Sequence, residues 1–315
     1  MAASRILTVS LNAAVDTTYV IDHFAVGKIN GVKEVTRMAG GKANNVARVL
    51  ASLGESVVAT GFAGGNAGRF IEEELQRNQV EPAYERVDGE NRVCLAIVDP
   101  AGHTLTEVRE KGPVITEADL DRFMDRFRML VRRVELVVLS GSLPPGVSAD
   151  IYGRLVGEAY QTAQVRTIVD AAGPALAQAL RAQPYLVKPN RDELEEWAGM
   201  ALPNEKAVLS AARKLIEAGP LVVAVSLGAD GLLLVSPQGA WRAEPPAVDV
   251  VNTVGSGDSL VAGFAAGLLR GLPAEEVLRL AVACGTANAL TTAVAVVRPD
   301  DLDRIRPKVR VTRIG

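Results

Sequence analysis

Short apolar runs alternate with amphipathic stretches along most of this chain. The runs at 6–11, 56–62 and 136–139 are typical of buried strands, and the stretches at 67–78 and 116–131 have apolar positions at helical spacing. This pattern predicts about eight strands that alternate with about eight helices. Repeated strand–helix units imply a mainly parallel sheet with helices on both faces, so the predicted fold class is α/β.

Four short strands of mixed polarity interrupt this alternation. Residues 18–21 and 32–38 form one pair, and residues 92–98 and 104–108 form another, with no helix inside either pair. Such segments fit a small, separate antiparallel sheet inserted into the main domain. One face of that sheet would need cover, so we expect it either to close over a binding site or to pair with another subunit.

Composition and charge narrow the function classes. The 315 residues are 48% hydrophobic and 23% charged, and the net charge of −3 gives no support to nucleic-acid or membrane-surface binding. Two cysteines suggest no disulfide framework, and with only two histidines a His/Cys metal cluster is not expected. The sequence has no signal-peptide pattern and no apolar run long enough to span a bilayer, so a cytoplasmic protein is the default expectation.

The most informative stretch is a glycine-rich turn, Gly255 to Asp258, that enters an apolar helix. Gly255 and Gly257 leave no side chain in the way of a ligand, and the unpaired N–H groups of a helix's first turn suit an anion such as phosphate. Asp258 can take a proton from a hydroxyl group beside that anion. An ordinary helix start with an acidic first turn would give the same pattern, so both interpretations stand at this point.

A second glycine-rich turn, Gly40-Gly41-Lys42, enters an amphipathic helix that Gly54 can end. It lacks the spacing of a P-loop, but its residue types suit an anionic or hydroxyl-rich ligand. Other polar loops follow strand-like runs, and the carboxyl ends of parallel strands share one edge of a sheet, so all should line one crevice. These loops contain Asp16, which can also be an ordinary turn carboxylate, residues 140–146, Asp170, residues 188–190 and residues 226–228.

Two glycine-rich helix starts in one crevice suggest two anionic or polyhydroxyl ligands side by side, with a carboxylate between them as a base. Phosphoryl transfer fits such a site, since it requires positioning and charge stabilisation more than covalent chemistry. Asn190 and Glu193 lie on one face of a predicted helix and can hold Mg²⁺ mostly through water. Glu193 can equally be a first-turn acid that stabilises its own helix.

The ordered set of motifs resembles the ribokinase-like carbohydrate kinases, the PfkB family. Residues 40–47, with Gly54 and Gly64 downstream, resemble the first signature of the family, and residues 253–258 resemble the second. Ala43 stands where glycine is usual. Intervening motifs of the family are matched, in the same order, at residues 140–146, 188–193 and 226–228.

The resemblance implies a ribokinase-like three-layer α/β/α fold with a mainly parallel central sheet, as one kinase domain over residues 1–315. The small sheet, drawn from about 12–38 and 90–109, would be its lid. Together with its expected exposure, the family suggests a homodimer through the lid sheet. The implied activity is phosphorylation of a sugar by ATP, with Mg²⁺ as a further cofactor.

The roles of family residues carry over to the matching positions of this sequence. Asp258 would be the base that deprotonates the acceptor hydroxyl, and Glu193 would organise Mg²⁺ through water. Gly255, Ser256 and Gly257 would supply backbone donors to the transferring phosphoryl group. The sugar phosphate would contact Asp16, Lys28, Gly40, Gly41, Lys42, Asn45 and Arg92. The nucleotide would contact Lys188, Asn190, Ser226, Gly228 and Asn288.

Within the family, the chain resembles kinases of phosphorylated ketohexoses. Residues 188–203 and 248–251 are similar to 1-phosphofructokinases, whereas residues 89–97 are more like tagatose-6-phosphate kinases. Cys94 and Ala96 stand where many 1-phosphofructokinases have Asn and Lys, so a possible phosphate partner is lost. We therefore expect a kinase of the tagatose-6-phosphate kinase or phosphofructokinase type that makes a ketohexose bisphosphate. The alternatives are fructose 1-phosphate as the acceptor, or a non-catalytic sugar- or nucleotide-binding regulator on the same fold.

Overall fold

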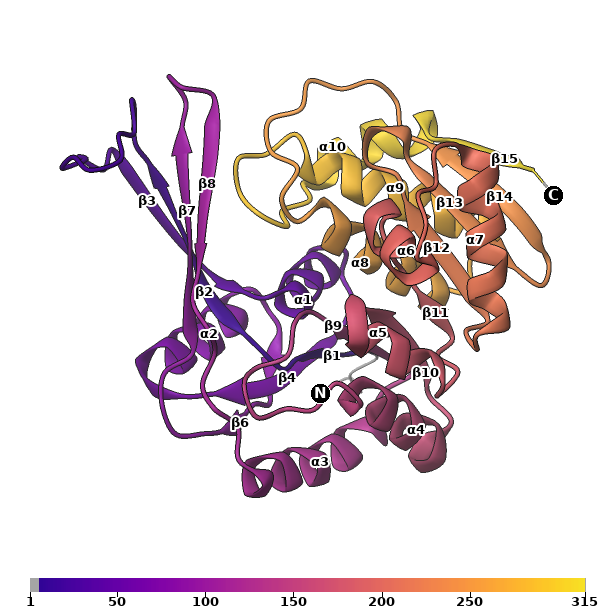
Figure 1. Ribbon diagram of the computed structural model, residues 1–315, viewed down its shortest axis with the longest axis horizontal. Helices are drawn as coiled ribbons and strands as arrows, with labels where there is room; N and C mark the ends of the chain where they lie inside the picture. Colours follow the sequence, from indigo (N-terminus) through magenta and orange to yellow (C-terminus); the bar gives the residue numbers. More distant parts are fainter. Residues whose placement is uncertain (1–5, 315) are drawn as a thin grey trace.

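Two β-sheets organise the computed structural model, which describes residues 6–314 (Figure 1). The parallel part of the eleven-stranded sheet runs through β5 (Glu81–Pro82), β4 (Val57–Ala63), β1 (Ile6–Ser10), β9 (Leu136–Ser140), β10 (Arg166–Asp170), β11 (Leu186–Val187) and β12 (Val222–Ser226). The short strand β6 (Glu85–Arg86) pairs with β4. The predicted α/β sheet is confirmed.

Antiparallel strands extend the sheet at its other edge, namely β13 (Leu232–Ser236), β14 (Gly239–Glu244) and β15 (Arg310–Arg313). β13 and β14 form a hairpin that does not end the sheet, because β15 from the C-terminal segment pairs with β14. Val311 is the one apolar residue among 310–313, so this edge strand gives little hydrophobic signal in the sequence.

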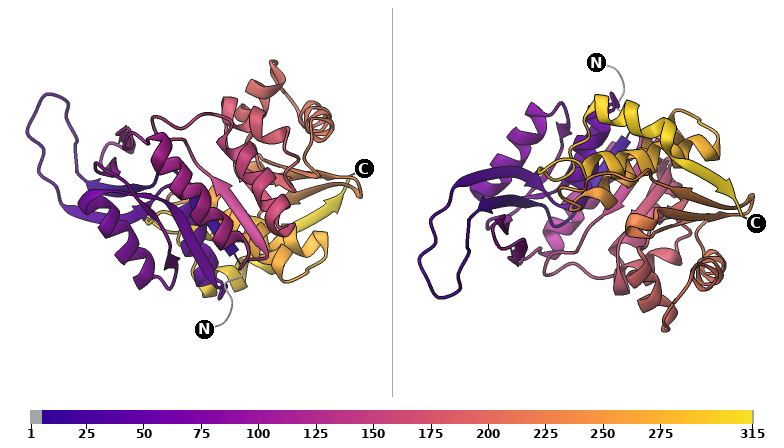
Figure 2. Two further views of the ribbon diagram at one scale, coloured as in Figure 1. Left: turned by 90° about the horizontal axis from the view of Figure 1, so that it is seen from below. Right: turned by 90° about the horizontal axis from the view of Figure 1, so that it is seen from above.

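Helices cover both faces of the large sheet (Figures 1 and 2). Side chains of one strand alternate between two cores: Leu136 and Val138 face one, and Val137 and Leu139 face the other. The first core is closed by α1 (Lys42–Ser52), α2 (Gly65–Arg77), α8 (Ser256–Leu269), α9 (Ala274–Asn288) and α10 (Pro299–Ile305). The second is closed by α3 (Glu117–Val131), α4 (Ile151–Ala163), α5 (Gly173–Leu180), α6 (Arg191–Ala198) and α7 (Glu205–Glu217).

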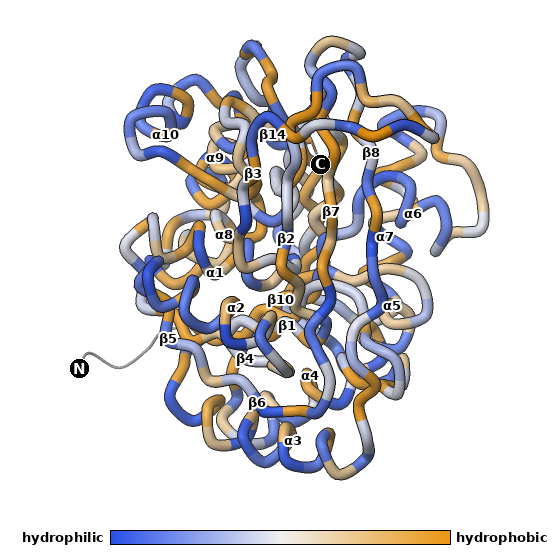
Figure 3. Tube along the Cα trace, turned by 90° about the vertical axis from the view of Figure 1, so that its left-hand side faces the viewer, coloured by the Kyte–Doolittle hydropathy of each residue, from blue (hydrophilic) through white to orange (hydrophobic). Residues whose placement is uncertain are grey.

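The small sheet stands apart from this body (Figure 1). Figure 3 shows its strand order, which is β3 (Glu34–Gly40), β2 (Ala14–Val20), β7 (Arg92–Asp99) and β8 (Thr104–Arg109). The prediction of an antiparallel sheet is wrong for its central pair, since β2 and β7 are parallel. Both strands follow the carboxyl ends of strands that pair in parallel with β4, β2 after β1 and β7 after β6, and therefore set out in the same direction.

The connection between β2 and β3, residues 21–33, projects away from the body (Figure 2). Val26 is 91% exposed and Ile29 is fully exposed on it. Within residues 6–314, no helix combines the length and the apolar character that crossing a membrane would require.

Candidate functional site

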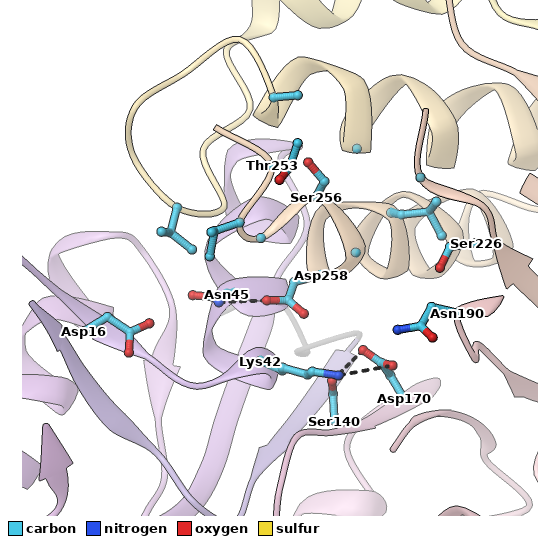
Figure 4. A pocket seen from close by; sticks show the side chains of 18 of the residues that line it. Asp16, Lys42, Asn45, Ser140, Asp170, Asn190, Ser226, Thr253, Ser256 and Asp258 are labelled. Atoms are coloured by element: carbon cyan, nitrogen blue, oxygen red, sulfur yellow. Dashed lines mark hydrogen bonds and ion pairs between the residues drawn. The ribbon is translucent and has the colours of Figure 1, made fainter. Parts of the chain in front are cut away.

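The site is a cavity at the carboxyl edge of the large sheet, between the first turns of α1 and α8 and the small sheet (Figure 4). Its volume is about 1000 Å³, which is room for two small ligands. Lys28, Gly40 and Asn288 do not line it. The predicted site residues that do are Asp16, Gly41, Lys42, Asn45, Arg92, Lys188, Asn190, Glu193, Ser226, Gly228, Gly255, Ser256, Gly257 and Asp258.

The turn at the start of α8 is held in a conformation that requires glycine. Gly255 has a φ of 84°, and a Cβ atom there would lie 2.6 Å from the backbone nitrogen of Ala295. Asn288 lies buried behind the turn, where its Nδ2 donates to the carbonyl of Val254 at 3.0 Å and to Ser256 Oγ at 2.9 Å. Asn288 therefore shapes the turn and does not face the cavity, contrary to the prediction that it contacts the nucleotide.

Asp258 lies in the first turn of α8 and is 7% exposed. It accepts a hydrogen bond from Asn45 Nδ2 at 2.7 Å, so the two glycine-rich helix starts meet at this carboxylate (Figure 4). Burial and the negative charge of Asp170 raise the pKa of Asp258 to about 6, although the Asn45 hydrogen bond, Lys42 and Lys188 lower it. At neutral pH the group is ionised yet more basic than an ordinary aspartate, as a general base must be.

Asp170, at the end of β10, holds two cations beside Asp258. Its Oδ1 is 3.3 Å from Lys188 Nζ and 3.7 Å from Lys42 Nζ, and its Oδ2 accepts a hydrogen bond from Ser140 Oγ at 3.2 Å. Burial raises the pKa of Asp170, but Lys188 and Lys42 outweigh burial and hold that pKa below the usual value. Two ammonium groups clustered in this way suit a highly charged phosphate. The sequence placed Asp170 in the crevice but gave it no role.

The face of the small sheet toward the cavity carries two carboxylates, Asp16 and Glu107, and two arginines, Arg92 and Arg109. Asp16 on β2 lies opposite Cys94 on β7, and Cys94 lies opposite Arg109 on β8. Burial raises the pKa of Asp16, and the charges of Arg48, Arg92 and Arg109 oppose that effect. Asp16 lies within β2, so the polar loop that was predicted to contain it ends before this residue.

Arg109 lines the cavity and was missed by sequence reasoning. Its Nη2 lies 2.7 Å from Glu107 Oε2, and Glu107 also lines the cavity. Positions 107 and 109 share one face of a strand, so alternation along β8 was the signal that could have found both. The face on which they lie depends on strand register, which the sequence alone does not reveal.

Two residues predicted to hold the sugar are placed differently. Gly40 lies under Asp16, and a Cβ atom at position 40 would sit 2.1 Å from Asp16 Cγ, so this glycine gives the carboxylate room. Lys28 lies on the exposed connection at 21–33 and outside the cavity of its own chain. Motif position indicated Lys28, but it carries no information on where a long exposed loop points.

Glu193 lines the cavity and also closes the N-terminus of α6. Its Oε2 accepts the backbone N–H of Asn190 at 2.8 Å, while Asn190 Oδ1 accepts that of Glu193 at 2.7 Å, which is a capping box. The described residues contain no group of three or more His, Cys, Asp or Glu side chains that could hold a metal ion directly. A single carboxylate at the cavity does fit Mg²⁺ that keeps most of its waters.

The opposite wall of the cavity is largely apolar. It includes Val248 and Val250 from the segment before α8, and Val282, Thr286 and Ala289 from the region of α9. A flat aromatic base can lie against such a wall, because binding pockets are mostly apolar with few polar anchors. The apolar pattern of α9 does not reveal this wall, since a core position and a cavity wall show the same periodicity in a sequence.

Comparisons with known proteins agree with this geometry. The model of the pfkB family of carbohydrate kinases matches residues 9–300. The tagatose-6-phosphate kinase of Staphylococcus epidermidis is 36% identical over 312 residues, which cover 98% of this chain and 100% of the relative. The 1-phosphofructokinase of Bacillus subtilis is 35% identical over 309 residues, which cover 98% and 100% of the two chains.

Solved structures extend the likeness to the fold. The tetrameric inhibited form of phosphofructokinase-2 from Escherichia coli superposes with a TM-score of 0.90 at 30% sequence identity, over 97% of this chain and 99% of that chain. An eleven-stranded sheet with a separate four-stranded sheet is the ribokinase-like arrangement expected from the motifs.

Proposed function

Because the chain belongs to the pfkB family of carbohydrate kinases, we propose that it transfers a phosphoryl group from ATP to a ketohexose phosphate. The product is a ketohexose bisphosphate. One observation carries the proposal. Asp258 accepts a hydrogen bond from Asn45 where the N-termini of α1 and α8 meet, and the charges of Lys42 and Lys188 act on it there. A base for a hydroxyl group and cations for phosphate thus lie together.

In the proposed reaction, the acceptor hydroxyl gives its proton to Asp258 as its oxygen bonds to the γ-phosphorus of ATP. The bond from that phosphorus to the bridging oxygen breaks, and ADP leaves. The backbone N–H groups of Gly255 and Gly257 hold the phosphoryl oxygens, because the first turn of a helix presents free donors. The N–H of Ser256 already donates to the carbonyl of Thr253 at 3.1 Å, so Ser256 shapes the turn. Lys188 adds positive charge on the nucleotide side, and charge stabilisation of this kind is the main requirement of phosphoryl transfer.

The remaining contacts are carried over from the family motifs to residues that line the cavity. Asp16, Gly41, Lys42, Asn45 and Arg92 hold the sugar phosphate. Asn190, Ser226 and Gly228 lie on the nucleotide side. Mg²⁺ would be held at Glu193 through water, where it would neutralise phosphate charge.

Residues of the small sheet determine which sugar phosphate binds. Arg92 and Arg109 both line the cavity there and can bind the phosphate that the acceptor already carries. The short side chain of Ala96 offers that phosphate no cation. We propose tagatose 6-phosphate or fructose 6-phosphate as the acceptor, and fructose 1-phosphate as the alternative.

We also propose one kinase domain with the small sheet as its lid, acting as a homodimer in the cytoplasm. Apolar residues are exposed on or beside the small sheet, and burial against a second copy would remove them from water. They are Val26, Ile29, Val35, Leu105 and Val108. Lys28 would bind sugar phosphate only if the exposed loop of one copy reached the cavity of the other. A solved relative is itself tetrameric.

The test is a comparison of kcat/KM for the three ketohexose phosphates, with ADP release as the readout. We expect at least one of them to be phosphorylated, and fructose 1-phosphate to be the poorest. A regulator on the same fold would bind ATP and sugar phosphate but release no ADP with any of the three. That result would remove the kinase proposal.

A further inference from the structure

Arg48 is a buried cation in α1, one turn beyond Asn45. Burial lowers the pKa of Arg48, and the carboxylates of Glu74, Asp16 and Asp258 oppose that effect. Among the described residues, the Nε of Arg48 has no hydrogen-bond partner. A buried charge with an unpaired donor is a costly way to fill space, so its contacts call for an explanation beyond packing.

The guanidinium of Arg48 joins three segments that meet at the cavity. Its Nη2 donates to Asn45 Oδ1 at 3.0 Å and to the carbonyl of Val294 at 2.9 Å, and its Nη1 donates to the carbonyl of Ala39. Ala39 comes just before the first glycine-rich turn. Val294 lines the cavity and packs against Gly255, where a Cβ atom would meet its side chain at 2.9 Å.

Arg48 decides which way the amide of Asn45 faces. Because Arg48 donates to Asn45 Oδ1, the amide nitrogen must lie on the other side, where it donates to Asp258. We infer that Arg48 is a positioning residue for phosphoryl transfer. Through Asn45 it maintains the hydrogen bond that orients Asp258, and through Val294 it supports the turn at the start of α8. The inference rests on the proposed function, in which Asp258 is the base.

The charges around Asp258 give the direction of the expected effect. Asp170 faces it from the end of β10, Lys42 from α1 and Lys188 from the segment after β11, and the charge of Arg48 interacts with it from within α1. Removing Arg48 takes away a positive charge and loosens the Asn45 hydrogen bond. Both changes favour the protonated carboxyl, so Asp258 should need a higher pH to ionise.

A double-mutant cycle tests whether Arg48 acts through Asn45. We expect Arg48→Met to lower kcat roughly tenfold and to leave the KM for ATP unchanged. In an Asn45→Ala background the same substitution should lower kcat by no more than about threefold, because the contact through which it acts is gone. If the double variant lost kcat by the full product of the two single losses, Arg48 would act independently of Asn45 and the inference would be overturned. Should Arg48→Met fail to fold, Arg48→Lys replaces it, since lysine keeps the charge but cannot make the forked contacts.

Direct titration of Asp258 provides a readout that does not depend on turnover. With ¹³C-labelled aspartate, the Asp258 carboxyl signal is identified by its loss in Asp258→Asn. Its midpoint should rise by about one pH unit in Arg48→Met, and the acid limb of kcat/KM should move in the same direction. An unmoved midpoint would overturn the inference. If the protein phosphorylates none of the ketohexose phosphates but the midpoint still rises, the proposed function fails and the positioning by Arg48 stands.

Arg270→Met is the matched control. Arg270 follows α8 and ties it to the far end of α1, with Nε 2.8 Å from Glu55 Oε1 and Nη2 2.7 Å from the carbonyl of Leu53. The Arg270→Met substitution therefore disturbs the packing of α1 against α8 at a place away from the cavity. We expect it to lower the thermal midpoint without moving the Asp258 titration. A shift equal to that of Arg48→Met would mean that any loosening of the helix pair suffices, which would overturn a specific role for Arg48.

Discussion

The first turns of α1 and α8 resemble each other in sequence but differ in charge and in pairing. Each follows a glycine with positive φ, Gly41 at 96° and Gly255 at 84°, and each opens into the cavity. The first turn of α1 carries Lys42 and contains no acidic residue. The first turn of α8 carries the buried Asp258.

In the proposed mechanism, this difference separates the binding of phosphate from proton transfer. On α1, Lys42 faces Asp170, which raises the pKa of the lysine and keeps it charged over the whole neutral range. On α8, the pKa of Asp258 is raised toward neutrality by burial and by Asp170, so its proton can move near pH 6. Two similar motifs therefore provide a fixed positive charge and a carboxylate that can take up a proton. The predictions below separate these two roles, beginning with the largest effect.

Asp258→Asn should abolish the chemistry and leave binding intact. We expect kcat to fall by roughly 10²–10⁴, because an amide cannot accept the hydroxyl proton, while ATP binding measured by calorimetry stays near wild type. The pKa of this carboxyl is 3.8 in an ordinary aspartate and about 6 in the folded protein, so its ionisation destabilises the folded state as the pH rises through this range. The amide avoids that cost, so the free energy of unfolding at pH 8 should rise by on the order of 1–3 kcal/mol.

The pH dependence of wild type gives the control for this prediction. In the proposed mechanism the ionised carboxylate takes up the hydroxyl proton, so kcat/KM should fall as pH drops through about 6. An Asp258→Asn protein with wild-type turnover would remove Asp258 as the base. An active protein whose acid limb lies near pH 4 would show that burial does not perturb this group.

Sequence reasoning placed Asn45, Lys188 and Asp258 in one cavity because strand topology determines where these segments end. Asn45, Lys188 and Asp258 each follow a strand or open a helix, and the carboxyl ends of parallel strands converge whatever the details of packing. Lys28 and Arg109 show where that logic stops. The first lies on a long loop and the second on a strand whose facing depends on register, and neither is determined by the hydrophobic pattern.

The capping box at the start of α6 confirms one of the two interpretations of Glu193, and the magnesium role stays a proposal. The sequence left Glu193 open as a first-turn acid or a magnesium group. In the structure it caps the helix with Asn190 and also lines the cavity. Local capping chemistry is readable from spacing, whereas exposure to a cavity depends on how α6 packs against the sheet.

Arg92→Ala should damage the binding end alone. Its guanidinium lies at the cavity with Nε 3.1 Å from the carbonyl of Asn12, and loss of a charge-assisted phosphate contact should raise the KM for the sugar phosphate roughly 10- to 100-fold. We expect kcat to change little. Arg109→Ala should have a smaller effect, because Glu107 already engages that arginine.

Arg37→Ala on β3 is the control for the two arginines. It lies on the small sheet but does not line the cavity, so the KM should be unchanged. A drop in kcat as large as the rise in KM for Arg92→Ala would contradict the separation of binding from chemistry. An unchanged KM would remove Arg92 from the phosphate site.

Gly255→Ala and Gly257→Ala test the turn itself, where the effects should be smallest. Alanine at 255 must hold a φ of 84° and place its Cβ 2.6 Å from the nitrogen of Ala295, so we expect a stability loss on the order of 1–3 kcal/mol and roughly tenfold lower kcat. A Cβ at 257 would meet only Lys188 Nζ, at an ordinary 3.7 Å, and alanine suits a helix better than glycine. Thermal unfolding should therefore separate the two variants. Equal destabilisation would mean that the turn is not held by the contact of Gly255 with Ala295, and the positioning of the phosphate-binding amides would need another cause.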